Sequence, residues 1–208
     1  MEDPSSLRTE EQSRRQLDRV GAFSDGVFAV AITLLVLNIE VPDVSDSDLA
    51  ASLDDLIPNV QAYFIAFAVI GLFWLGHHLA WARFTSSTRG LVWANLLLLS
   101  LIALMPFTTA LIGEYGGEAI AVTIFAANVG LAAIADSFVD RVAYREGIVE
   151  DLSGEEVRGQ VLAGWMRPAI FLASIPVAWL IGTTVAMYMW LLLFAVTPLA
   201  RRWAGTAT

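Results

Sequence analysis

The sequence predicts an all-α integral membrane protein with six transmembrane helices. Hydrophobic residues make up 57% of the chain, against about 45–50% in soluble domains. The mean hydropathy is +0.64, and the apolar residues lie in runs of roughly 18–25, the length needed to cross a hydrocarbon layer of about 30 Å. All basic residues lie between these runs or at their ends in a one-sided pattern, as expected for a multi-pass membrane protein.

Six apolar segments define the expected spans, which lie near 20–40, 59–82, 90–112, 119–140, 166–182 and 184–201. Pro58 precedes the second span and suits the first turn of a helix. Gly182 begins the short polar link between the last two spans, so we expect them to form a tight hairpin. Ser153 and Glu156 form a capping-box pattern that predicts a cytoplasmic helix leading into the fifth span.

The expected domains are a cytoplasmic segment over 1–18, a six-helix membrane domain over 19–203 and a short cytoplasmic tail over 204–208. All basic residues are arginines, and all lie in the connections that this arrangement places on one side. The positive-inside rule therefore predicts that both termini are cytoplasmic. The opposite connections are acidic, which is typical either of solvated loops or of rings that concentrate cations near a pore.

Composition also argues against several classes of function. The net charge of −9 argues against a nucleic-acid partner, and the absence of cysteine excludes disulfides and thiolate metal sites. The first 19 residues are polar and the apolar run after them is too long for a signal-peptide core, so we expect no cleavable signal. No nucleophile–base pair or metal-binding spacing supports an enzyme, and we expect no cofactor.

Polar residues on three spans share one depth in the membrane. Asp25, His77 and Asn95 each lie six residues from the arginine that marks the cytoplasmic end of their span, which is about 9 Å at 1.5 Å per residue. Unpaired polar groups at that depth are costly, so we expect a mutual hydrogen-bonded network. The nearby polar residues that could join it are Ser24, His78 and Asp136.

This polar layer has three interpretations. It is a structural clamp between the first span and its neighbours, a proton relay or pH-sensitive gate, or a metal site. The metal site is the weakest, because His77 and His78 are adjacent on a helix and point about 100° apart. A relay through Asp25, His77 and His78 would suit a proton-coupled secondary transporter, although paired interrupted helices are not evident. A purely structural scaffold is a further alternative.

The first span carries an apolar stripe of Val30, Leu34 and Leu37, in which Leu34 and Leu37 each lie within about 40° of Val30 at 100° per residue. Thr33 flanks the stripe, and Asp25 points about 140° away from Val30 by the same rotation. Periodicity alone leaves open whether the stripe faces lipid, packs against protein or lines a pore, because this helix is apolar all round. The opposite side carries Phe28, Ile32, Leu35 and Ile39.

Three stretches resemble the transmembrane protein 175 potassium channel family. Arg19, Phe23, Ser24 and Asp25 match its Arg-x-x-x-Phe-Ser-Asp signature at the start of the first span. The other two stretches are Phe-Trp-Leu-Gly-His-His at 73–78, and Trp-Ala-Asn-Leu at 93–96 followed by Ala-Leu-Met-Pro-Phe at 103–107. The resemblance covers about residues 15–112. Beyond residue 112 it rests mainly on the number of spans.

The resemblance implies a passive potassium-permeable cation channel in the plasma membrane of a bacterium. Bacterial members carry one six-span repeat and form symmetric homotetramers whose first helices surround the pore. Carried over by position, the apolar constriction falls on Val30, Leu34 and Leu37, and Thr33 matches a layer associated with selectivity. Val30 departs from the Ile or Leu usual in the innermost layer. The family motif at 19–25 would tie the first helix to its neighbours.

Overall fold

The computed structural model describes residues 4–45, 48–149 and 154–192, with side chains described outside 4–10 and 154–163. The described regular structure is helical apart from one isolated bridge between Phe84 and Val149. The elements in order are α1 (Pro4–Leu34), η1 (Leu35–Asn38), α2 (Leu49–Asp55), α3 (Ile57–Trp81), α4 (Arg89–Tyr115), α5 (Ala119–Arg145), α6 (Gly154–Leu180) and α7 (Thr183–Trp190).

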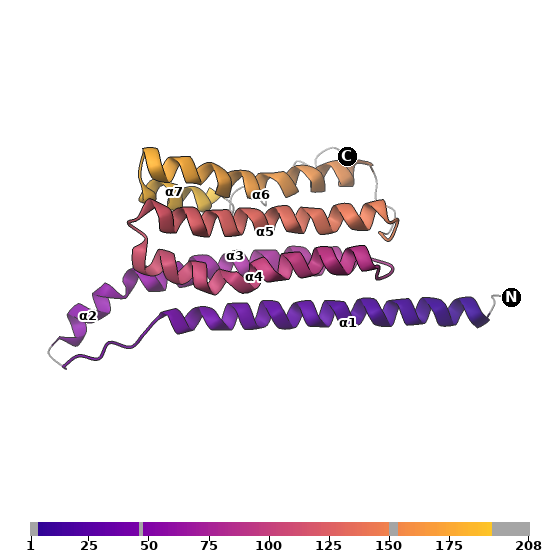
Figure 1. Cartoon of the computed structure of the whole chain (residues 1–208), viewed down its shortest axis with the longest axis horizontal. Coiled ribbons are helices and arrows are strands. Elements are labelled where there is room, and N and C mark those ends of the chain that lie inside the picture. The colour runs from indigo at the N-terminus through magenta and orange to yellow at the C-terminus, as the bar shows by residue number, and fades with distance from the viewer. Residues whose placement is uncertain (1–3, 46–47, 150–153, 193–208) are drawn as a thin grey trace.

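The long helices lie side by side in successive layers (Figure 1). α1 forms one edge and packs on α3 and α4, α5 packs on the other side of α4, and α6 with α7 forms the far edge. The N-terminal part of α1 extends beyond the ends of the neighbouring helices (Figure 1). α1 is therefore an edge helix, which the described part of its own subunit covers on one side.

In the part of the chain that the structure describes, four helices are long and apolar enough to cross a membrane, by length and composition: Glu11–Asn38, Ile57–Trp81, Arg89–Tyr115 and Ala119–Arg145. These helices confirm the prediction of an all-α membrane protein. The fifth and sixth spans fall on α6, on α7 and on residues 193–201 outside the described part, so the count of six stays a prediction. Ser153 of the expected capping box and the 204–208 tail also lie outside the described residues.

The C-terminal end of α1 is held by hydrogen bonds at Asn38, in the 3₁₀ turn that follows the α-helix. Asn38 Nδ2 donates to the carbonyl oxygen of Pro106 in α4 at 3.0 Å, and Asn59 Nδ2 of α3 donates to the carbonyl oxygen of Asn38 at 3.2 Å. A helix end inside a membrane needs such partners for its free backbone groups. These two bonds connect α1 to both of its neighbours.

The loop between α3 and α4 pairs with the chain that follows α5. The Thr85 amide donates to the carbonyl oxygen of Ile148 at 2.9 Å, beside the Phe84–Val149 bridge. Thr88 is the N-cap of α4, and its hydroxyl oxygen accepts from the Leu91 amide at 3.1 Å. The Thr88 hydroxyl also contacts the carboxylate of Glu146. These contacts fix the ends of α4 and α5 relative to each other.

The packing of α5, α6 and α7 centres on three aromatic rings. Phe125 lies 6.4 Å from Phe171 and 4.9 Å from Trp190 between ring centroids. Trp190 Nε1 donates to Ser174 Oγ at 3.0 Å, which satisfies the indole N–H inside the bundle. The turn between α6 and α7 places Gly182 at φ +142°, a conformation that side chains rarely allow. As predicted, α6 and α7 form a tight hairpin.

Phe125→Ala is expected to lower the midpoint of thermal unfolding in detergent, because it removes the ring that joins α5 to α6 and α7. Truncation of a buried Phe typically costs about 3–5 kcal/mol. The control is Ile124→Ala, because Ile124 precedes Phe125 on the same helix and its side chain is exposed. Equal midpoints for the two variants would contradict the three-ring cluster.

Candidate functional site

Three buried polar side chains form a hydrogen-bonded chain across α1, α4 and α3. His77 Nε2 lies 2.9 Å from Asn95 Oδ1, and Asn95 Nδ2 donates to Ser24 Oγ at 2.8 Å. Ser24 Oγ in turn donates to the carbonyl oxygen of Val20 at 2.9 Å. Because an amide oxygen only accepts, His77 Nε2 is the nitrogen that carries the proton in this contact. All three side chains are almost fully buried.

Asp25 was expected in this network, and the structure places it outside. Its Oδ1 accepts from Trp74 Nε1 at 2.9 Å, and both side chains are exposed on the chain's own surface. His78, also expected in the layer, stacks on Trp74 with ring centroids 5.4 Å apart. Neighbouring residues on a helix point about 100° apart, so when Ser24 faces α4 and His77 faces Asn95, Asp25 and His78 must turn away.

Asp136 also lies outside the polar chain. Its Oδ2 is 3.1 Å from Arg167 Nη1, and this ion pair joins α5 to α6. The guanidinium group passes next to Gly76 of α3, where an added Cβ would lie 3.5 Å from it. Asp136 thus serves the contact between the outer helices. No cluster of three potential metal ligands occurs among the described residues.

A second contact of α1 was not anticipated from the sequence. Trp81 Nε1 donates to the carbonyl oxygen of Leu17 at 3.2 Å, and the indole ring lies directly against Gly21. The same ring stacks on His77 with centroids 4.6 Å apart. The Phe28 ring of α1 also lies against His77, with ring centroids 5.5 Å apart. The Trp81 ring therefore connects α1 to the polar chain. In the sequence, only the glycine at position 21 could have indicated such a close approach.

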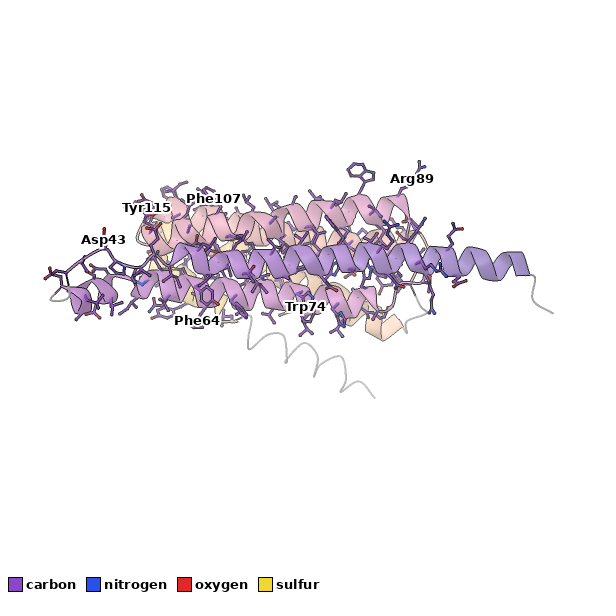
Figure 2. All side chains as sticks on the ribbon, turned by 90° about the horizontal axis from the view of Figure 1, so that it is seen from below. Asp43, Phe64, Trp74, Arg89, Phe107 and Tyr115 are labelled. Carbon is purple, nitrogen blue, oxygen red and sulfur yellow. The ribbon has the colours of Figure 1, made fainter. Side chains whose placement is uncertain are left out.

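The opposite faces of α1 differ sharply in burial. Phe28 and Leu35 are 1% and 0% exposed, whereas Val30, Leu34 and Leu37 are 56%, 42% and 68% exposed. Leu37 lies in the 3₁₀ turn, where residues three apart eclipse, so its side chain aligns with Leu34. The described part of the subunit therefore leaves much of each stripe side chain uncovered. Figure 2 views the molecule from the side where α1 lies in front of the bundle.

The remaining predicted site residues accompany this exposed side. Thr33 is exposed, and its hydroxyl donates within the helix, with the carbonyl oxygens of Ala29 and Val30 at 3.0 and 2.9 Å. Arg19 and Phe23 are also exposed. The structure thus divides the motif residues. Ser24 faces the core of the subunit, and the other members face outward.

Comparison with known proteins gives concordant matches. The family model described as the endosomal/lysosomal potassium channel TMEM175 matches residues 19–106. A protein of Streptomyces collinus named a potassium channel is 42% identical over 118 residues, which are 56% of this chain and 57% of that protein. A chicken protein named the endosomal/lysosomal proton channel TMEM175 is 38% identical over 107 residues, covering 47% of this chain and 21% of that protein.

The fold also matches a solved structure. The crystal structure of a homologue from Chamaesiphon minutus, described as a lysosomal potassium-selective channel TMEM175 homologue, superposes with a TM-score of 0.79 at 28% identity. The match covers 89% of this chain and 98% of that chain. By sequence, the matched segments span between 54% and 65% of the length of the bacterial relatives.

Gly21→Ala is expected to destabilise the protein, because its Cβ would lie 2.9 Å from Trp81 Nε1 and push the indole away from Leu17. The matched control is Gly26→Ala on the same helix, where no atom lies within 4 Å of the added Cβ. Thermal unfolding in detergent should show a lower midpoint only for the first variant, and Trp81→Leu in the Gly21→Ala background should restore part of the loss. Equal midpoints for both alanine variants would contradict the close contact.

Proposed function

The chain belongs to the TMEM175 family, and from this we propose that it is a potassium-permeable cation channel in the plasma membrane of a bacterium. The family is one of ion channels, not enzymes. The proposed channel conducts passively, without a cofactor, and its permeant ions are K⁺ and other monovalent cations. Its constriction consists of Val30, Leu34 and Leu37 on α1.

The observation that carries this proposal is the one-sided burial of α1. A single chain contributes one apolar stripe, which cannot enclose a pore, while Phe28 and Leu35 on the opposite face are buried. Closed rotational symmetry would bring identical stripes together around an axis. We propose four copies, as the family resemblance implies, with α1 of each subunit nearest the axis and its other helices outside.

The chemistry of the stripe suits a hydrophobic constriction. A narrow ring of Val30, Leu34 and Leu37 would exclude water and block ions when closed, and would become hydrated when the helices separate. Thr33 would lie beside this ring. Its hydroxyl proton is directed to the backbone of its own helix, so the oxygen lone pairs remain available to a passing cation. Val30 is smaller than the usual residue, which would leave the innermost ring wider.

In this proposal the polar contacts hold α1 in place and do not conduct. Ser24, Asn95 and His77 fasten the inner half of α1 by its buried face. Asp25 and Trp74 form a second link at the same level on the outer surface of the subunit. Because these contacts lie opposite or beside the stripe, they keep Val30 and Leu34 turned outward.

The alternative is a proton-coupled secondary transporter that uses Asp25, His77 and His78. The animal relatives named proton channels give proton movement some support. However, the described part of the chain contains no hydrogen-bonded path from Asp25 to either histidine, because the partner of Asp25 is Trp74. An indole N–H only donates and cannot relay a proton. Flux from liposomes under opposing K⁺ and Na⁺ gradients separates the two functions, since a transporter would show saturable flux that requires a proton gradient.

Leu34→Ala and Leu37→Ala are expected to raise cation flux in these liposomes or to weaken discrimination between K⁺ and Na⁺, because each widens the apolar ring. Leu131→Ala is the control, since Leu131 is exposed on α5, away from α1. Unchanged flux and selectivity in both α1 variants would refute the pore assignment.

Asp25→Ala is expected to reduce the yield of assembled protein more than it changes ion preference, because it removes the acceptor of Trp74 Nε1. The measurement is the tetramer fraction in size-exclusion chromatography, followed by flux of whatever assembles. Asp54→Ala, an exposed carboxylate on α2, is the control. A normal tetramer yield with altered selectivity would place Asp25 in the ion path instead.

A further inference from the structure

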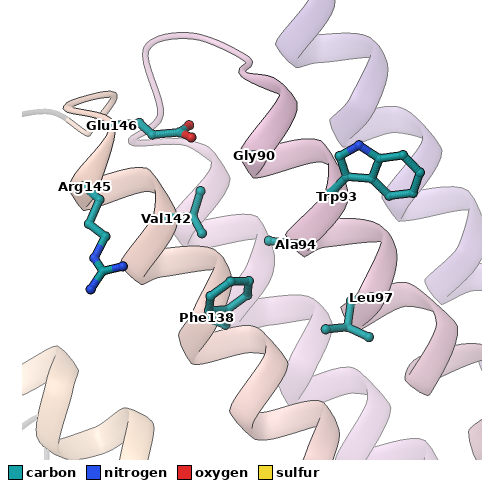
Figure 3. A pocket seen from close by; sticks show the side chains of 8 residues that line it. All are labelled: Gly90, Trp93, Ala94, Leu97, Phe138, Val142, Arg145 and Glu146. Carbon is teal, nitrogen blue, oxygen red and sulfur yellow. The ribbon is translucent and has the colours of Figure 1, made fainter.

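An open groove of about 430 Å³ lies between α4 and α5, next to the paired loops that follow α3 and α5. Its walls are apolar and come from both helices (Figure 3). The wall residues are Trp93, Leu97, Phe138 and Val142. At one end the groove meets two consecutive residues of opposite charge, Arg145 and Glu146. The groove therefore has apolar walls and one charged end.

The two charged side chains are available to a ligand. Arg145 and Glu146 do not form an ion pair with each other, and Arg145 pairs with no carboxylate among the described residues. Glu146 is held in position by the Thr88 hydroxyl. It is directed toward Gly90, while Arg145 lies on the α5 side of the groove (Figure 3). The glycine at position 90 leaves room for this approach, because an added Cβ would require the Glu146 carboxylate to shift.

The position of the groove in the membrane follows from the orientation predicted above. Arg89 and Arg145 mark the cytoplasmic ends of α4 and α5, so the charged end lies at the headgroup level of the inner leaflet. Trp93 is 73% exposed at this depth, which is typical of an interfacial tryptophan. In the channel proposed above, α5 is separated from α1 by the layer of α3 and α4. The groove therefore lies away from the ion path and is open to lipid.

We propose that this groove binds one phosphatidylethanolamine molecule of the inner leaflet. An acyl chain would lie along the apolar walls, the phosphate would contact the Arg145 guanidinium, and the primary ammonium would contact the Glu146 carboxylate. A guanidinium can bind a phosphate through two N–H groups, and a primary ammonium has three N–H donors. Phosphatidylglycerol offers Glu146 no cation, and the choline group of phosphatidylcholine has no N–H to donate.

The test is lipid retention by the purified full-length protein in native mass spectrometry. The protein is exchanged into detergent containing equal amounts of phosphatidylethanolamine, phosphatidylglycerol and phosphatidylcholine with identical acyl chains. The wild type should retain phosphatidylethanolamine preferentially. Glu146→Gln should reduce that preference about tenfold, the ratio expected when one charge-assisted hydrogen bond is lost. Arg145→Gln should reduce retention of all three lipids, because each carries the phosphate that the guanidinium binds. Arg141→Gln, an exposed arginine outside the groove lining, is the control and should retain the wild-type preference.

A second variant tests the apolar part of the groove. Leu97 is half-exposed in the wall, so Leu97→Trp should fill the groove and reduce retention of all three lipids without disturbing the buried core. Equal retention of the three lipids by the wild type, or an equal loss in Arg141→Gln, would overturn the proposal. Preference for phosphatidylglycerol would also overturn it, because that lipid requires only a cation. The readout does not depend on ion flux, so failure of the channel proposal would leave this result interpretable.

Discussion

The fixed orientation of α1 about its own axis is the constraint on which the rest of the structure depends. In a membrane, a serine, an asparagine and a histidine must satisfy their polar groups within the protein. Ser24, Asn95 and His77 do this through one another, and each comes from a different helix. Because rotation of α1 would break this chain and leave buried polar groups unpaired, the contact determines which face of α1 points inward.

Burial of Ser24 has a direct consequence for the rest of the helix. The buried face continues through Phe28, Ala31 and Leu35, which lie four, seven and eleven positions after Ser24. The opposite face then carries apolar side chains that the described part of the subunit leaves largely exposed, and helices that associate in membranes do so by close packing. A fixed buried face and an exposed apolar face are what the proposed symmetric assembly requires of α1.

The depth of the polar residues could be predicted from the sequence, but their direction could not. Counting from the nearest arginine placed His77 and Asn95 at one level, and they are in contact. The same count could not decide between Ser24 and Asp25, which share a depth and differ by one step of rotation. Asp136 was misplaced for the same reason, since its side chain faces α6. The Trp81–Gly21 contact gave no periodic signal, because it depends on the absence of a side chain.

The two joints of α1 limit how a constriction could widen. Ser24 is held to α4 at the inner end, and Asn38 is bonded to Pro106 of the same helix at the outer end. Val30, Leu34 and Leu37 lie between these joints, where the contacts of the buried face are apolar. Moving the whole of α1 away from its subunit would break buried hydrogen bonds at both ends. Bending of the segment between the joints, or movement of entire subunits, would keep these bonds intact and is therefore the less costly way to open the ring.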